Sequence, residues 1–302
     1  MRRGVFTNSL VNVARGLVMG AADVVPGVSG GTMALLLGIY DRLVGQIALL
    51  SSGAGRLLRG RPKQAVAMAR GADWLFLVSL GCGIAVAIGG LVEVVRVLIS
   101  EQPVLLSAAF FGLVAATVVT TRREVGRWDA RLVVVFVAVA VAVFFVLGIR
   151  SGSVAEPSSA VVLGAGALAI CAMILPGISG AFVLLLLGLY DPITEAVSDR
   201  RLGTIALFGL GAATGLGLFS RLLERLLARS RDLVVAMLMG LMAGSLRVLW
   251  PWPADTEDVA SFGNAALGAP PASDLASAIV VATVAAAVAA GLHRLGARRR
   301  PA

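Results

Sequence analysis

Two apolar stretches, each interrupted by the sequence Pro-Gly-x-Ser-Gly, constrain the fold of this chain more than any other feature. The first break lies at residues 26–30 and the second at residues 176–180, so a constant offset of 150 residues relates them. Proline lacks an amide hydrogen and disfavours helix in the residue before it, while glycine tolerates backbone conformations that other residues avoid. Each stretch is therefore predicted to be a helix that stops and restarts, leaving free N–H groups where the second half-helix begins.

The similarity between the two stretches continues beyond the breaks. Residues 38–41 read Gly-Ile-Tyr-Asp and residues 188–191 read Gly-Leu-Tyr-Asp, again at an offset of 150. One long duplication explains this better than a short repeated unit, because the matching features recur only once. We predict one repeat at residues 1–150 and a second at residues 151–302, which together form a single integral membrane domain.

The composition indicates a protein that crosses a membrane several times. Hydrophobic residues make up 58% of the chain and charged residues 14%, and the mean hydropathy is +0.93. Besides the broken stretches there are six apolar runs long enough for a hydrocarbon core of about 30 Å. These runs lie at about 74–98, 104–121, 131–149, 203–227, 233–250 and 275–293. The predicted fold is an all-α polytopic membrane protein with two inverted repeats. Each repeat has a broken or re-entrant helical hairpin followed by three transmembrane helices.

Charge distribution predicts the orientation of the chain. A broken hairpin returns to the side on which it began, so three further spans place the two repeats in opposite orientations. Basic residues concentrate in a linker at about 51–72, at 122–131 and at 225–231, whereas the loops at 100–103 and 251–274 are neutral or acidic. The positive-inside rule then places both termini in the cytoplasm. It also explains the net charge of +9 without a nucleic-acid partner.

The two breaks have the chemistry of an anion site. Backbone N–H groups, a hydroxyl and a helix start come together at each, which suits phosphate above all. Broken helices at matching positions of two repeats also indicate a transporter's binding site. The alternative is that small residues only allow close helix packing. The candidate headgroup ligands are Gly27, Ser29, Gly30, Gly31 and Thr32 in the first break, and Gly177, Ser179 and Gly180 in the second.

Five charged residues in or near apolar runs are further candidates, because charge inside a membrane is costly and often functional. Arg15 could contact the headgroup, or its side chain could extend to the inner interface. Asp23 precedes the first break by one turn; it could pair with a cation, take a coupling proton or accept bonds from nearby N–H groups. Glu93, Glu224 and Arg221 are coupling or gating candidates, with interfacial positions at helix ends as the alternative.

The sequence offers little for catalysis. His293 is the only histidine, and no glycine-rich phosphate loop with lysine is present. We therefore expect no catalytic residues, no metal site, no cofactor and no use of ATP. Tyr40 and Tyr190 end the two restarted half-helices and are interpreted as aromatic residues at the membrane interface.

The runs 25–32 and 175–180, with the Gly-x-Tyr that follows each, resemble PopT-type undecaprenyl-phosphate (polyprenyl-phosphate) translocases. The resemblance extends from about residue 8 to residue 293. It implies a flippase of the bacterial plasma membrane that returns undecaprenyl phosphate from the outer to the inner leaflet. The lipid carrier is then reused for peptidoglycan and other envelope polymers. The expected partners are undecaprenyl phosphate and membrane lipids. Ala181 departs from the pattern, since a small hydroxyl residue is expected there, and this weakens the second break as a phosphate ligand.

Two other functions are compatible with parts of the pattern. Membrane undecaprenyl-diphosphate phosphatases also have inverted repeats and a Pro-Gly-x-Ser turn. Their turn, however, carries arginine after the serine, where this chain has Gly30 and Gly180, and they have a Glu-x-x-x-Glu pair that is missing here. A carrier or channel for a small soluble anion is the second alternative.

Overall fold

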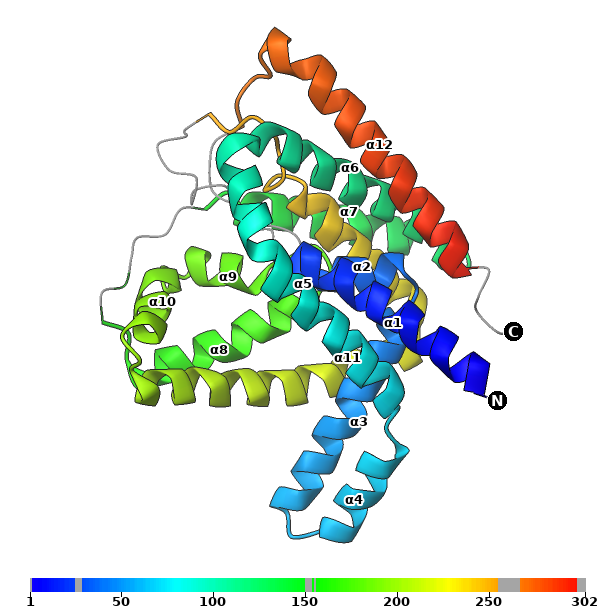
Figure 1. The fold of residues 1–302 in the computed structure, drawn as a ribbon, viewed down its shortest axis with the longest axis vertical. Coiled ribbons are helices and arrows are strands. Elements are labelled where there is room, and N and C mark those ends of the chain that lie inside the picture. The colour runs from blue at the N-terminus through cyan, green and yellow to red at the C-terminus, as the bar shows by residue number, and fades with distance from the viewer. Residues whose placement is uncertain (1, 25–28, 150–153, 155, 255–266, 298–302) are drawn as a thin grey trace.

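Helices are the only regular secondary structure, apart from one isolated bridge, in the part that the structure, a computed structural model, describes: residues 2–24, 29–149, 154, 156–254 and 267–297. Figure 1 shows these helices packed around a common centre, with one hairpin projecting from the body. The α-helices in chain order are α1 (Arg2–Asp23), α2 (Gly30–Leu36), α3 (Tyr40–Leu58), α4 (Pro62–Gly71), α5 (Trp74–Glu101), α6 (Pro103–Thr121), α7 (Ala130–Val146), α8 (Ser159–Ile174), α9 (Gly180–Leu186), α10 (Tyr190–Ser198), α11 (Leu202–Ser245) and α12 (Ala272–Ala297).

Several helices have the length and composition of membrane spans. Of the described residues, α5, α6, α11 and α12 each include a stretch long and apolar enough to cross a membrane. A fifth span is possible if α9 and α10, which are bent by 116° at a short break, count as one. The apolar helices α7 and α8 are shorter. The prediction of an all-α, multi-pass membrane protein is therefore confirmed.

The half-helices that follow the two breaks have the same local backbone structure. The short helices α2 and α9 begin and end at positions exactly 150 residues apart, and so do the starts of α3 and α10. Gly38 and Gly188, which follow α2 and α9, both have φ +67°. This left-handed conformation is strained for residues with a side chain, so glycine is required at both turns. The duplication seen in the sequence thus extends to the backbone at both restarted half-helices.

Close helix crossings depend on glycines at corresponding positions of the two halves. At Gly16, a β-carbon would overlap the carbonyl oxygen of Leu80, where α1 crosses α5. At Gly166, 150 residues later, a β-carbon would overlap the carbonyl oxygen of Phe208, where α8 crosses α11. Only glycine lets the backbones approach this closely, as in many membrane helix pairs.

In a second pair of crossings, helices of one predicted repeat pack against helices of the other. Gly112 brings α6 against Ala282 of α12, and Gly240 brings α11 against Phe136 of α7. Each contact joins a helix of one predicted repeat to a helix of the other. The two predicted repeats therefore share one packed interior.

Two regions differ from the sequence-based expectation. The basic linker expected at 51–72 is mostly helical, because α3 continues to Leu58 and α4 follows after a short turn. The runs expected at 203–227 and 233–250 belong to one assigned helix, α11, whose direction changes at Ser230 (φ −152°, ψ 64°). Its 44 residues would rise about 66 Å if straight, twice a hydrocarbon core, so this break still allows two spans.

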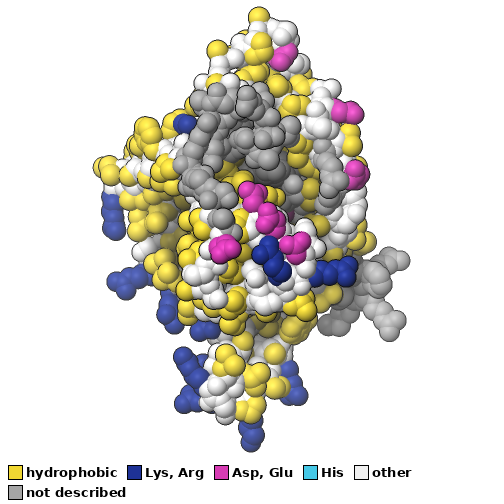
Figure 2. All heavy atoms as spheres, turned by 90° about the vertical axis from the view of Figure 1, so that its left-hand side faces the viewer, with side chains coloured by type: hydrophobic (Ala, Val, Ile, Leu, Met, Phe, Trp, Pro, Cys, Tyr) yellow, Lys and Arg dark blue, Asp and Glu magenta, His cyan; other side chains and the backbone are white. Residues whose placement is uncertain are grey.

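Charge is separated along the molecule. The α3–α4 hairpin carries exposed basic residues, namely Arg56, Arg59, Arg61, Lys63 and Arg70. Figure 2 shows Lys and Arg both on this projection and on the body, whereas Asp and Glu lie on the body. The hairpin is therefore the most basic projection on this face of the molecule.

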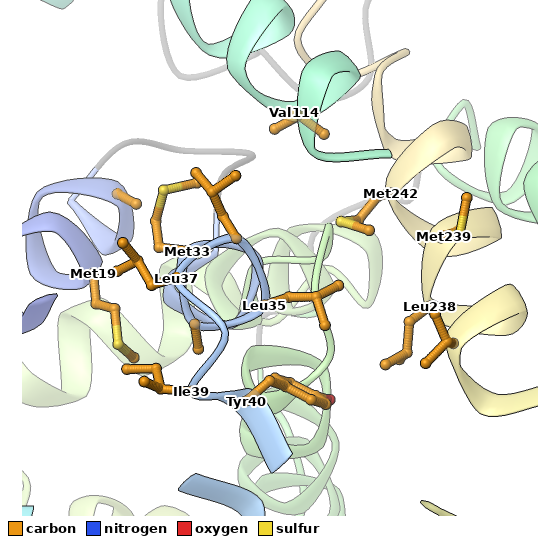
Figure 3. Close-up of a cluster of buried hydrophobic side chains, with 14 of the residues drawn as sticks. Met19, Met33, Leu35, Leu37, Ile39, Tyr40, Val114, Leu238, Met239 and Met242 are labelled. Atoms are coloured by element: carbon orange, nitrogen blue, oxygen red, sulfur yellow. The ribbon is translucent and has the colours of Figure 1, made fainter. Parts of the chain in front are cut away.

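The core surrounds the first restarted helix. Every residue of α2 is buried. Figure 3 shows Met33 and Leu35 of α2 among side chains from α1, α6 and α11, such as Met19, Val114 and Met242. A seven-residue helix is too short to be stable alone, so its packing holds it in place. The half-helix that restarts after the first break therefore lies in the interior of the protein.

Candidate functional site

Ser29 joins the first break to the second. Its side chain is 1% exposed, and its hydroxyl donates to the carbonyl oxygens of Met173 (3.1 Å) and Leu175 (3.3 Å) at the end of α8. The same oxygen accepts a bond from the Gly31 N–H at 3.1 Å, so Ser29 caps α2. One hydroxyl thus holds the start of α2 against the second broken stretch, 144 residues away in sequence.

Asp23 occupies the side of α2 where an anion was predicted. The Gly30 N–H donates to Asp23 Oδ1 at 2.6 Å, which links the end of α1 to the start of α2. A β-carbon on Gly30 would lie 2.6 Å from the other carboxylate oxygen, so glycine leaves the room that this contact needs. The carboxylate accepts from a helix start, as a phosphate oxygen does in other proteins. In this conformation the protein supplies its own acceptor for the Gly30 N–H.

Two further bonds connect the broken stretches. Thr32 is fully buried, and its hydroxyl oxygen accepts from the Gly177 N–H at 2.8 Å. The Tyr40 hydroxyl donates to the carbonyl oxygen of Ile174 at 3.3 Å. Tyr40 is only 2% exposed, so its interpretation as an interfacial aromatic residue is wrong. Its position in the sequence matches an interface, but the packing of the second broken stretch covers it.

The second break is built on close backbone contacts. Gly177 has φ +89°, and a β-carbon there would lie 2.7 Å from Met242 Cα and 2.9 Å from Ser245 Oγ of α11. At Gly180, it would lie 2.7 Å from the carbonyl oxygen of Ala169 in α8. Both glycines are thus required by their neighbours.

The two serines of the motif differ. Ser29 is buried and its side chain caps α2, whereas Ser179 is partly exposed and makes no side-chain bond to the start of α9. The first break is therefore the more tightly built of the two. The sequence anticipates this asymmetry through Ala181 and Phe182, which carry no hydroxyl and stand where the first break has Gly31 and Thr32.

The predicted charged candidates lie in different places. Arg15 is partly buried on α1 and donates to Asn12 Oδ1 at 3.1 Å. Glu93 is exposed on α5. Arg221 donates to the carbonyl oxygen of Ser51 at 2.5 Å, where α11 packs against α3. Glu224, one turn further on, is exposed and faces α3 at Gly45. Asp23 is thus the charged candidate whose hydrogen bond to Gly30 places it at the first break.

Some residues at the junction escaped the sequence analysis. Met242 and Ser245 have no motif around them, and they reach Gly177 only because α11 folds against the second break. Tyr40 was noticeable in the sequence because Tyr190 repeats it 150 residues later, but nothing in the sequence indicated that it is buried. The predicted ligand Gly27 lies outside the described residues. Within the described ranges, no group of three or more His, Cys, Asp or Glu side chains is suited to a metal ion.

Comparisons with known proteins agree with the predicted resemblance. A family model described as "Undecaprenyl phosphate translocase-like" matches residues 19–265. The polyprenyl-phosphate transporter of Vibrio cholerae is 39% identical over 246 residues, which cover 81% of this chain and 79% of that protein. The polyprenyl-phosphate transporter of Staphylococcus aureus is 27% identical over 259 residues, covering 80% and 86%. No solved structure matches this chain. The protein is thus a member of the undecaprenyl phosphate translocase-like family, whose members are transporters rather than enzymes.

Proposed function

We propose that this protein moves undecaprenyl phosphate across the bacterial plasma membrane, from the outer to the inner leaflet, so that the lipid is reused in envelope synthesis. The observation that carries the proposal is the junction of the two breaks. Backbone N–H groups, Ser29, Thr32 and Asp23 meet there inside a membrane protein. The names of the family and of both relatives support a polyprenyl phosphate as substrate.

The headgroup would bind at the first break by exchanging places with Asp23. A phosphate and a carboxylate are both anionic acceptors, so the Gly30 N–H that now bonds to Asp23 can bond to a phosphate oxygen instead. The rest of this binding site, made of backbone N–H groups and hydroxyls, would come from Gly27, Ser29, Gly31 and Thr32. Gly177, Ser179 and Gly180 would approach from the second break. Arg15 would assist if its side chain turns from Asn12 toward the headgroup.

The charge that moves with the lipid needs a coupling or gating device, for which Asp23 is the first candidate. Releasing its carboxylate from α2 requires a new partner or a proton, because a buried unpaired charge is costly. Glu93, Glu224 and Arg221 remain further candidates. The Arg221 bond to Ser51 would open if α11 moved along α3. The polyprenyl tail would stay in the lipid while the headgroup crosses.

The two halves, residues 1–150 and 151–302, would act as inverted repeats. The matched glycine crossings and the identical turns after α2 and α9 support a duplication. Inverted repeats would provide two related gates for alternating access. Membrane lipids are the remaining expected partners, and neither ATP nor a nucleic acid is part of this proposal.

Both termini are expected in the cytoplasm. In a background with Cys82→Ala and Cys171→Ala, a membrane-impermeant maleimide added to intact cells should label Ser273→Cys at the start of α12. It should leave Lys63→Cys in the basic hairpin unlabelled until the cells are permeabilised. The physical reason is that basic segments stay on the cytoplasmic side. The reverse labelling pattern would invert the topology.

Transport itself is tested by reconstitution. Proteoliposomes with labelled undecaprenyl phosphate should expose the lipid to an added, non-penetrating phosphatase faster than protein-free liposomes. The same vesicles with undecaprenyl diphosphate should release no phosphate without that phosphatase, which separates a transporter from the phosphatase alternative. Excess inorganic phosphate should leave the rate unchanged, which argues against a soluble-anion carrier. Equal exposure in protein-free vesicles would contradict the proposal.

A further inference from the structure

An arginine at the end of α11 lacks a counter-ion among the residues that the structure describes. The guanidinium carbon of Arg247 lies 4.7 Å from the ring centre of Phe144, near the end of α7. Its Nε is buried without a hydrogen-bond partner, and no ion pair involves this residue in the described ranges. Arginine has five N–H donors and stays charged in proteins, so a partly buried guanidinium calls for an acceptor.

The surroundings hold this guanidinium in place without neutralising it. A β-carbon at Gly148 would lie 2.7 Å from the Arg247 guanidinium carbon, so glycine makes room for the flat group against the backbone. The neighbouring residues Leu147 and Val248 are buried in an apolar cluster with Phe182 of α9. A cation–π contact with Phe144 stabilises the charge only partly. The Arg247 guanidinium is thus a hydrogen-bond donor held in a fixed position among apolar side chains.

This arginine lies close to the second break. Ser245, two residues earlier, packs against Gly177, and Phe182 belongs to the half-helix that restarts after that break. A second donor in the same segment also lacks a hydrogen-bond acceptor. The indole N–H of Trp252 is buried without a partner, and indole is a donor only. Two buried donors within residues 247–252 indicate a ligand rich in acceptors, which a phosphate is.

We propose that Arg247 is the capture site for the phosphate monoester of the lipid substrate, from which the headgroup passes to the two breaks. This inference rests on the proposed function. The planar guanidinium can hold two phosphate oxygens with parallel bonds. The apolar cluster below would accept the first part of the hydrocarbon tail. The residue acts by binding, and the lipid leaves it chemically unchanged.

The test measures binding of a short-chain, fluorescent polyprenyl phosphate to the purified protein in nanodiscs. Arg247→Gln should weaken binding about ten- to a hundredfold, the size expected for charged hydrogen bonds. The affinity of Arg247→Lys should lie between those of the wild type and Arg247→Gln. Lysine keeps the positive charge but lacks the paired N–H donors of the guanidinium. Gly148→Ala should also weaken binding, since it displaces the guanidinium without removing it. The matched control is Arg201→Gln, because Arg201 already pairs with Glu195 and Asp199; it should change binding less than about twofold.

Competition and transport separate the possible outcomes. Unlabelled undecaprenyl phosphate should displace the probe, whereas phosphatidylglycerol and inorganic phosphate should not at the same concentration. Displacement by either would overturn the inference, because the site would then serve phospholipids or free anions. Wild-type transport with unchanged binding in Arg247→Gln would overturn it as well, while leaving the proposed function intact. If Arg247→Gln fails to fold, the other two variants decide. Unchanged binding in both Arg247→Lys and Gly148→Ala would then overturn the inference. Absence of both binding and transport in the wild type would instead refute the proposed function.

Discussion

Replacing Gly30 by valine is expected to abolish transport of undecaprenyl phosphate. A β-carbon at Gly30 would lie 2.6 Å and 2.9 Å from the two Asp23 carboxylate oxygens, so the carboxylate must move away from the Gly30 N–H. The branched side chain would then fill the space in which we propose that a phosphate oxygen binds. The measurement is the rate of leaflet exchange in proteoliposomes at matched protein content. We expect it to fall to the protein-free background.

The control for this substitution is Gly81→Val in α5. Gly81 is exposed, and nothing lies within 4 Å of an added β-carbon there. Relative to alanine, glycine costs a helix about 1 kcal/mol and valine at most roughly 0.7, so this exchange does not weaken the helix. Gly81→Val should therefore transport nearly as fast as the wild type. If Gly30→Val inserts and transports like Gly81→Val, the first break does not bind the phosphate and the proposed mechanism is refuted.

Replacing Thr32 by valine is expected to loosen the junction between the two halves. Valine has nearly the same shape, but it removes the oxygen that accepts from the Gly177 N–H at 2.8 Å. Both residues are buried, so that N–H would be left without a partner. The cost is about 1–3 kcal/mol of the free energy of unfolding. A lower melting temperature in detergent or nanodiscs, together with slower transport, is the expected result.

Thr117→Val supplies a matched comparison for Thr32→Val. Thr117 is also fully buried, yet its hydroxyl donates to the Leu113 carbonyl one turn earlier in α6. That carbonyl lies within the helix and keeps its backbone bond when the hydroxyl is removed. The loss in stability should therefore be smaller than for Thr32→Val. Equal losses would mean that the Thr32–Gly177 bond adds nothing to the junction beyond ordinary packing.

The sequence determined the parts of this protein that depend on local chemistry. Pro-Gly-x-Ser-Gly interrupts a helix wherever it occurs, because proline and glycine act on their own backbone. The starts of α2 and α9 therefore lie where the motif predicts. Apolar runs of sufficient length likewise predict membrane helices, because the thickness of the bilayer sets the length of a span. The family was also recognisable from the paired motifs.

Only the tertiary structure decided which groups meet at the breaks. Ser29 and Met173 are 144 residues apart, and no local rule pairs them. The burial of Tyr40 and the arrival of Ser245 at Gly177 both depend on how α8 and α11 pack. The segment predicted to be a basic linker forms the α3–α4 hairpin instead, because a run of charged residues does not prevent a helix. A motif specifies where a helix must stop, but the packing of distant helices decides what its free N–H groups contact.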